Sequence, residues 1–211
     1  MLIITIKQGK EKAILAGDPW IYLSAIDKVE GKPHERSKIG ATALVQSSSR
    51  QFLARAAYNV KSQIAGRVWT LREDEPVDHA LIKRRVQEGL ARRSESWRGA
   101  DPQALVQLID GEQDGLSGLQ VHGYGGASGY VICQFNAGGV EYWKIPIVQA
   151  LLKETGCPNV YERSEKSLRE AEGLPFKARA LAGEDPPSRL MVRDGQRLLP
   201  MDIRTGFTYP R

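Results

Sequence analysis

The chain has 211 residues, of which 41% are hydrophobic and 26% are charged, the ordinary balance of a globular protein rather than a disordered or fibrous one. No apolar run approaches the roughly 20 residues that span a bilayer, and the N-terminus lacks the charged leader and cleavage site of a secretory signal. Two cysteines, Cys133 and Cys157, are too few for a disulfide framework. These features predict a cytoplasmic protein with no membrane segment.

The net charge of +5 is unevenly distributed along the chain. Residues 1–100 carry 18 Lys and Arg against 11 Asp and Glu, whereas residues 101–211 carry 12 against 14. A basic N-terminal half is typical of an RNA-binding module at that end. A basic balance is also common in proteins that bind no nucleic acid, so the charge alone leaves both readings open.

The first 72 residues contain several short β-branched or alternating segments with little helix between them. Gly, Pro and Ser turns separate these segments, which is typical of a small β-barrel domain covering residues 1–72. The predicted helix covers 10–16, where Gly17 ends it, and a polar loop is expected at 30–38. The predicted strands are 2–6, 20–26, 41–46, 52–58 and 64–71.

The segment 52–70 combines strand-like alternation with positive charge around a turn at 58–60. Arg55, Lys61 and Arg67 stand beside the neutral donors Ser62 and Gln63. Fixed cations with hydroxyl and amide donors on a rigid sheet suit a sugar-phosphate backbone. The alternative is a hairpin whose charges are simply solvated.

A charged connector at 73–76 separates this domain from a predicted helix that Asp78 caps. Its apolar stripe contains Val77, Leu81, Val86 and Leu90. The opposite side is basic and is either solvated or a second phosphate-contacting surface; it carries Lys83, Arg84, Arg85, Arg92 and Arg93.

The remainder predicts a small α/β domain at 76–185, with strands around central helices, followed by a hairpin segment at 188–211. One helix is expected at 141–154, started or kinked by Pro146 and closed by Gly156, and another at 164–171, capped by Ser164. The Gly-rich loop 123–129 lacks the glycine pattern and the strand–helix context of a dinucleotide site. The predicted fold class of the whole chain is therefore α+β. The predicted strands of the α/β domain are 105–109, 119–122 and 130–135.

No residue set in this chain forms a self-sufficient active site. His34, His79 and His122 are far apart in sequence and pair with neither cysteine at metal-ligand spacing. Cys133 lies inside an apolar run and is expected to be buried, and the carboxylates of 112 and 114 flank a tight turn. We expect no catalytic, metal-binding or cofactor-binding residue here.

Several collinear motifs resemble the PUA-domain, S-adenosylmethionine-dependent methyltransferases that modify cytosine C5 in large-subunit ribosomal RNA. The chain departs from that family at Asp18, Ala56 and Val60, and in its acidic loop at Gln113 and Ser117. The motifs lie between about residues 5 and 205: KQGKEK at 7–12, GDPWI at 17–21, DGEQDGLSGL at 110–119, YERS at 161–164 and EGLP at 172–175.

This resemblance implies a PUA fold for 1–72 and ribosomal RNA as the partner, with Trp20 either stacking on a base or packing in the core. It also implies that the catalytic domain would follow Gly206 and Phe207, where the chain ends. We therefore expect an RNA-binding portion without S-adenosylmethionine of its own. The expected RNA contacts are Lys7, Lys10, Lys12, Trp20, Arg55, Lys61, Ser62, Arg67, Lys83, Arg84 and Arg85.

Two alternatives remain open from the sequence. The chain could be one component of a functional methyltransferase whose catalytic domain is a separate or lost chain. It could instead be a protein-interaction scaffold or homodimer, since strand edges at 191–203 would seek a partner.

Overall fold

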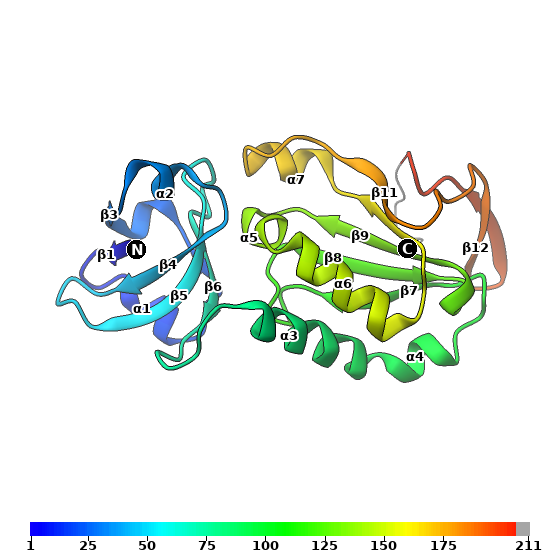
Figure 1. Ribbon diagram of the computed structural model, residues 1–211, viewed down its shortest axis with the longest axis horizontal. Coiled ribbons are helices and arrows are strands. Elements are labelled where there is room, and N and C mark those ends of the chain that lie inside the picture. Colours follow the sequence, from blue (N-terminus) through cyan, green and yellow to red (C-terminus); the bar gives the residue numbers. More distant parts are fainter. Residues whose placement is uncertain (206–211) are drawn as a thin grey trace.

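The computed structural model describes residues 1–205 as two sheet-centred units side by side, with a terminal hairpin packed on the second (Figure 1). Residues 206–211, which include the expected Gly206 and Phe207 motif, lie outside the described residues.

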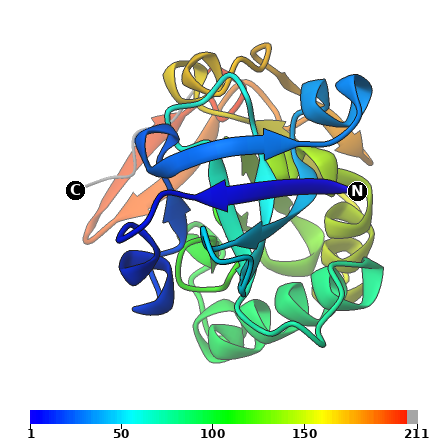
Figure 2. The same ribbon diagram turned by 90° about the vertical axis from the view of Figure 1, so that its left-hand side faces the viewer.

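The first unit is a six-stranded sheet in the order β2-β6-β5-β4-β1-β3, with β1 and β4 parallel and the other neighbours antiparallel. In Figure 2, β1 and β3 run across the strands behind them, because the sheet is strongly curled. Ile4, Ile6 and Val45 fill its fully buried core, as their alternation in the strands predicts. The strands are β1 Leu2–Ile6, β2 Trp20–Ile21, β3 Ile26–Glu30, β4 Ala41–Gln46, β5 Phe52–Tyr58 and β6 Gly66–Thr70.

Two expectations for this unit were wrong in detail. The predicted strand at 20–26 is broken after β2 by a 3-10 turn at Leu23–Ala25, because the Leu23 amide bonds the carbonyl of Gln63 instead of a strand partner. The predicted polar loop at 30–38 contains a short helix, α2 (Pro33–Ser37). Pro33 fixes its first turn, and the Glu35 carboxylate accepts from the Lys32 amide. The other helix is α1, Glu11–Leu15.

The second unit is a five-stranded sheet in the order β11-β10-β9-β8-β7, in which only β9 and β10 are parallel. The sequence predicted strands around central helices, but the strands form one sheet and the helices lie outside it. Helices α3 (His79–Arg92) and α6 (Lys144–Thr155) pack on one face of the sheet, while the hairpin β12–β13 covers part of the other. The strands are β7 Leu105–Asp110, β8 Leu119–Tyr124, β9 Tyr130–Phe135, β10 Val160–Arg163, β11 Ala178–Ala182, β12 Leu190–Asp194 and β13 Arg197–Met201.

Strand β9 shows why both faces of this sheet are covered. Val131, Cys133 and Phe135 point into the large core under helices α3 and α6, whereas Ile132 points to the opposite side and packs against Val192 of the hairpin. Successive side chains of a strand alternate between faces, so a continuous apolar strand requires cover on both. The helices are α3 His79–Arg92, α4 Ser94–Arg98, α5 Gly138–Tyr142, α6 Lys144–Thr155 and α7 Lys166–Ala171.

The helix ends agree with most of the sequence signals. The Asp78 carboxylate accepts from the Leu81 amide at 2.9 Å, which confirms the predicted cap of α3. Pro146 is the third residue of α6, a position where its missing amide costs no helical hydrogen bond, and Gly156 ends the helix at a φ of +69°. Ser164 does not cap α7: it is buried, and its hydroxyl accepts from the Phe135 amide.

Two further observations concern the Gly-rich loop and membrane-spanning helices. The Gly-rich loop after β8 contains only a 3-10 turn, Gly126–Ser128, before β9, so it connects two strands as expected. Across residues 1–205, no helix is both long and apolar enough to cross a membrane.

Candidate functional site

A cleft of about 350 Å³ opens where the two sheet-centred units meet. The β5–β6 turn of the first unit lines it together with the 112–120 segment and helix α7 of the second. The lining residues include Trp20, Gln63, Ile64, Glu112, Gln120 and Leu168.

Glu172, just after α7, joins the two units at the floor of this cleft. Its carboxylate is 95% buried and accepts from Arg67 at 3.0 Å, Ser62 at 2.8 Å and the Asn59 side chain at 3.0 Å. The Gly138 amide donates to the same carboxylate at 3.1 Å. Three side chains of the first unit therefore converge on one buried charge of the second. We call this set, Glu172 with Asn59, Ser62 and Arg67, the interdomain latch.

A second carboxylate, Glu112, sits on the other side of Arg67. It accepts from the indole N–H of Trp20 at 3.0 Å, from the Ser117 hydroxyl at 2.8 Å and from the Gly118 amide at 3.1 Å. The Arg67 guanidinium lies 3.6 Å from Glu112 and donates to the Ser117 hydroxyl at 2.9 Å. Arg67 is therefore held between two carboxylates, and the edge of Trp20 is fixed in place.

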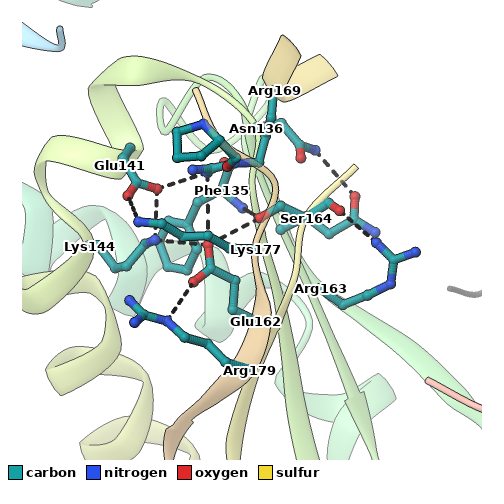
Figure 3. Close-up of polar contacts among 12 residues, drawn as sticks. Phe135, Asn136, Glu141, Lys144, Glu162, Arg163, Ser164, Arg169, Lys177 and Arg179 are labelled. Carbon is teal, nitrogen blue, oxygen red and sulfur yellow. Dashed lines mark hydrogen bonds and ion pairs between the residues drawn. The ribbon is translucent and has the colours of Figure 1, made fainter. Parts of the chain in front are cut away.

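Helix α7, which Glu172 directly follows, is anchored by a buried ionic cluster (Figure 3). Arg169 is fully buried and donates to Glu141 at 2.8 Å and to the Phe135 carbonyl at 2.5 Å. Lys144 bridges Glu141 and Glu162 at 2.7 and 2.8 Å. Because Arg169 precedes Glu172 by less than one helical turn, the cluster fixes the approach of Glu172 to the first unit.

The charges of this cluster shift the pKa of Glu141. Burial by itself would raise that pKa, but hydrogen bonds from Lys144, Lys177 and Arg169 outweigh it and lower the pKa from 4.5 to about 2. Glu141 is thus ionised at neutral pH.

Six of the predicted RNA-contact residues form two groups. Ser62 and Arg67 belong to the interdomain latch, so their polar groups are already used within the chain. Four lysines have exposed side chains: Lys7, which donates to the Ser24 carbonyl at 3.0 Å, and Lys10, Lys12 and Lys61. Lys10 and Trp20 together line a smaller hollow of about 170 Å³ on the first unit.

The basic side of α3 is not the uniformly solvated face that was one sequence alternative. The Arg85 guanidinium donates to the carbonyls of Gly115 and Trp69, and burial lowers its pKa. Arg92 and Arg93 both pair with the buried carboxylate of Asp114. Three of the five cations on this side of α3, Arg85, Arg92 and Arg93, therefore bind groups of the chain itself.

The other predicted cations, Lys83, Arg84 and Arg55, make fewer contacts with the rest of the chain. Lys83 is exposed, and Arg84 is half-exposed and pairs with Glu75 at 2.6 Å. Arg55 donates to the Glu73 carbonyl at 3.0 Å. RNA contact by these residues stays a prediction.

The described residues offer little reactive chemistry. Cys133 and Cys157 are both fully buried, and burial raises the pKa of each thiol. Burial also lowers the pKa of His122 to about 4. Within the described part of the chain, no three His, Cys, Asp or Glu residues gather at metal-binding distance. Asp114 accepts from the Asp110 amide at 2.9 Å and pairs with two arginines, in keeping with the predicted structural role of the acidic turn.

The comparisons with known proteins agree with a curled sheet that precedes a mixed α/β unit. Residues 4–71 match a PUA-like domain. Nearly the whole chain is also similar to proteins named Ribosomal RNA large subunit methyltransferase I. The identity is 34% over 208 residues with the Vibrio cholerae protein and 32% over 208 residues with that of Aliivibrio fischeri. Each of these alignments covers 97% of this chain and 50% of the relative.

Solved structures show the same fold. A candidate SAM-dependent methyltransferase from Streptococcus mutans superimposes with a TM-score of 0.77 at 13% identity, over 99% of this chain and 50% of the other. A second candidate methyltransferase, complexed with SAH, gives 0.76 at 13% identity, over 98% of this chain and 49% of the other. The chain thus spans about half the length of the relatives that it matches.

Sequence reasoning missed the two residues that organise the cleft. Glu172 was noticed only as part of the EGLP motif, and Glu112 only as part of a turn. Neither signal indicates a partner, because Arg67 lies 105 positions before Glu172 and Trp20 lies 92 positions before Glu112. The available hint was a carboxylate within a motif, directly after a short predicted helix.

Proposed function

We propose that this chain is the RNA-binding portion of a protein related to large-subunit ribosomal RNA methyltransferases. The observation that carries the proposal is the match of a PUA-like domain at residues 4–71, within a similarity to such enzymes that covers 97% of the chain. The excess of Lys and Arg over Asp and Glu in residues 1–100 supports it, since phosphate contacts supply much of RNA affinity.

Within this proposal, the exposed lysines hold the phosphate backbone. Lys7, Lys10, Lys12 and Lys61 have exposed side chains, and Lys83 extends the set along α3. We propose that residues 1–72 and 76–185 act as two domains held in one orientation, with 188–211 as a separate hairpin segment. Because the interdomain latch already uses Ser62 and Arg67, we assign those two residues to domain orientation and not to RNA contact.

We further propose that residues 1–205 do not themselves transfer a methyl group. The resemblance implies methyl transfer from S-adenosylmethionine to cytosine C5 through a cysteine adduct, which requires an accessible thiolate. Cys133 and Cys157 are buried and their pKa values are raised, so neither supplies one. Methyl transfer by the whole protein remains part of the proposal.

Titration of the chain with labelled ribosomal RNA fragments over a salt series tests RNA binding. A variant with Lys7, Lys10, Lys12 and Lys61 changed to Ala is expected to bind more weakly. Removing one lysine–phosphate interaction should flatten the slope of log K against log[salt] by about 0.7 on single strands. The control changes Lys153 and Lys166 to Ala, which are exposed and lie outside the predicted contact set. Equal binding by both variants, or a flat salt response, contradicts the proposal.

A second candidate function, a homodimeric scaffold, is favoured by one observation. Leu198 and Leu199 of β13 are 42% and 41% exposed, and in the described chain the outer edge of β13 pairs with no strand. Light scattering at high protein concentration tests it: a dimer that Leu198→Ser and Leu199→Ser dissociate supports the scaffold, and a monomer refutes it.

A further inference from the structure

The charge at the floor of the interdomain cleft disfavours a phosphate group. Glu112 and Glu172 contribute two negative charges, and Arg67 between them contributes one positive charge that both carboxylates share. The floor therefore carries a net negative charge, which repels an anion and attracts groups with N–H donors. A nucleic acid that enters this cleft would present a base to it and leave its phosphates outside.

The walls of the cleft suit a flat, largely apolar group. Trp20 forms one side, while Ile64 of the first domain and Leu168 and Ala171 of α7 also line the cleft. Leu168 is 51% exposed, so an apolar side chain faces solvent at the wall of the cleft. The hydrogen bond from Trp20 to Glu112 holds the indole in place before any ligand arrives. Unstacked RNA bases commonly bind on aromatic side chains and on Arg guanidinium planes, and the Arg67 guanidinium lies 5.9 Å from the Trp20 ring centre.

Two polar groups in the cleft retain hydrogen-bonding capacity. A carboxylate has about four acceptor positions, and Oε2 of Glu112 accepts only the indole N–H of Trp20 among the described residues. Gln63 is exposed, and its side-chain amide makes no hydrogen bond within the described chain. A carboxylate acceptor matches an exocyclic amino group, and an amide can donate and accept along a base edge.

Two lysines lie near residues that line the cleft. Lys61 is exposed, and its aliphatic stem lies against Gly173, directly after Glu172 of the cleft floor. Trp20 lines both the cleft and the smaller hollow that contains Lys10. Cations at the rim and carboxylates at the floor separate the binding of phosphates from the binding of a base.

We propose that the interdomain cleft binds one unstacked base of a single-stranded RNA segment, a base with an exocyclic amino group. The base stacks beside Trp20, its amino group donates to Glu112 and its edge meets the amide of Gln63, while Lys10 and Lys61 hold the flanking phosphates. This inference rests on the proposed RNA-binding function and assigns it a specific subsite.

The test measures fluorescence anisotropy with labelled seven-nucleotide oligomers of rC, rA and rU. The wild-type chain should bind rC and rA about tenfold more tightly than rU, which has no amino group. Trp20→Leu should weaken binding of rC and rA by roughly 5- to 150-fold, the equivalent of one stacked base. Glu112→Gln should reduce the preference for rC and rA over rU. The Gln63 side chain is exposed and makes no hydrogen bond within the described chain, so Gln63→Ala should weaken rC and rA binding several-fold without affecting the fold.

The control variant is Phe176→Ala, which removes an aromatic side chain that is 43% exposed and does not line the cleft. If no oligomer binds the wild-type chain at low salt, the RNA-binding function and the subsite both fail. Salt-dependent binding without a base preference, with Gln63→Ala and Trp20→Leu no weaker than Phe176→Ala, leaves RNA binding intact and overturns the subsite. Free cytidine monophosphate that binds as tightly as the rC oligomer also overturns it, since the cleft would then recognise a nucleotide and not a strand.

Discussion

Replacement of Glu172 by alanine is the sharpest test of how the two domains are held together. The change removes a carboxylate that is 95% buried and leaves Arg67, whose side chain is 13% exposed, without its nearest countercharge. The Ser62 hydroxyl and the Gly138 amide lose their acceptor at the same time, while the Asn59 side chain keeps its hydrogen bond to the main-chain carbonyl of residue 172. All of these groups stay at the domain boundary, so the destabilisation falls on the contact between domains.

The expected cost is about 3–5 kcal/mol of unfolding free energy, the usual effect of removing one partner from a buried ion pair. In a dry site, leaving these two neutral donors unsatisfied would add about 1–3 kcal/mol each. The adjacent cleft of about 350 Å³ lets water reach them, so the total should stay near the ion-pair value. Such a change corresponds to a melting temperature lower by roughly 6–20 °C for a chain of this size.

Urea denaturation followed by circular dichroism measures this destabilisation. The matched control is Glu170→Ala, two residues earlier, where the carboxylate is 62% exposed and lies 3.9 Å from Lys166; its cost should be below about 1 kcal/mol. Adding Arg67→Met to Glu172→Ala removes the orphaned cation and should cost less than the sum of the single changes by about 1–3 kcal/mol. A Glu172→Ala variant as stable as Glu170→Ala would refute the latch.

Three further predictions concern the domain contact, acid stability and the thiols. Gly40→Ala should destabilise the chain by about 2 kcal/mol or more in urea denaturation, because Gly40 has a φ of +82° and a Cβ there would lie 2.1 Å from the Gly138 carbonyl. With the pKa of Glu141 lowered from 4.5 to about 2, its contribution to stability is complete above pH 4.5 and is lost as the pH falls from 4.5 to 2. Glu141→Gln should remove that part of the pH dependence of unfolding; an unchanged acid slope contradicts it. Cys133 and Cys157 are fully buried and should react with a thiol reagent only after denaturation, whereas rapid reaction in the folded chain contradicts their burial.

The sequence by itself determined the elements whose signals are local. β-branched or alternating segments located β1, β4 and β5 at their observed bounds, the Asp78 cap located the start of α3, and Gly156 located the end of α6. These signals depend on residues within about one turn or one strand of each other, so they can be read without the rest of the chain. The burial of Cys133 followed in the same way from its apolar strand.

Only the tertiary structure decided what the polar residues do. Arg67 was predicted to contact RNA because it is a cation on a strand, yet its guanidinium meets Glu172 across the domain boundary. Arg85 was predicted to lie on an outer basic face, yet it donates to two carbonyls of its own chain. The free energy of a charge depends on burial and on partners within a few ångströms, and sequence distance does not constrain which partners those are. Composition and periodicity therefore determined the strands and helices, while the contact between domains decided which cations remain available to bind a ligand.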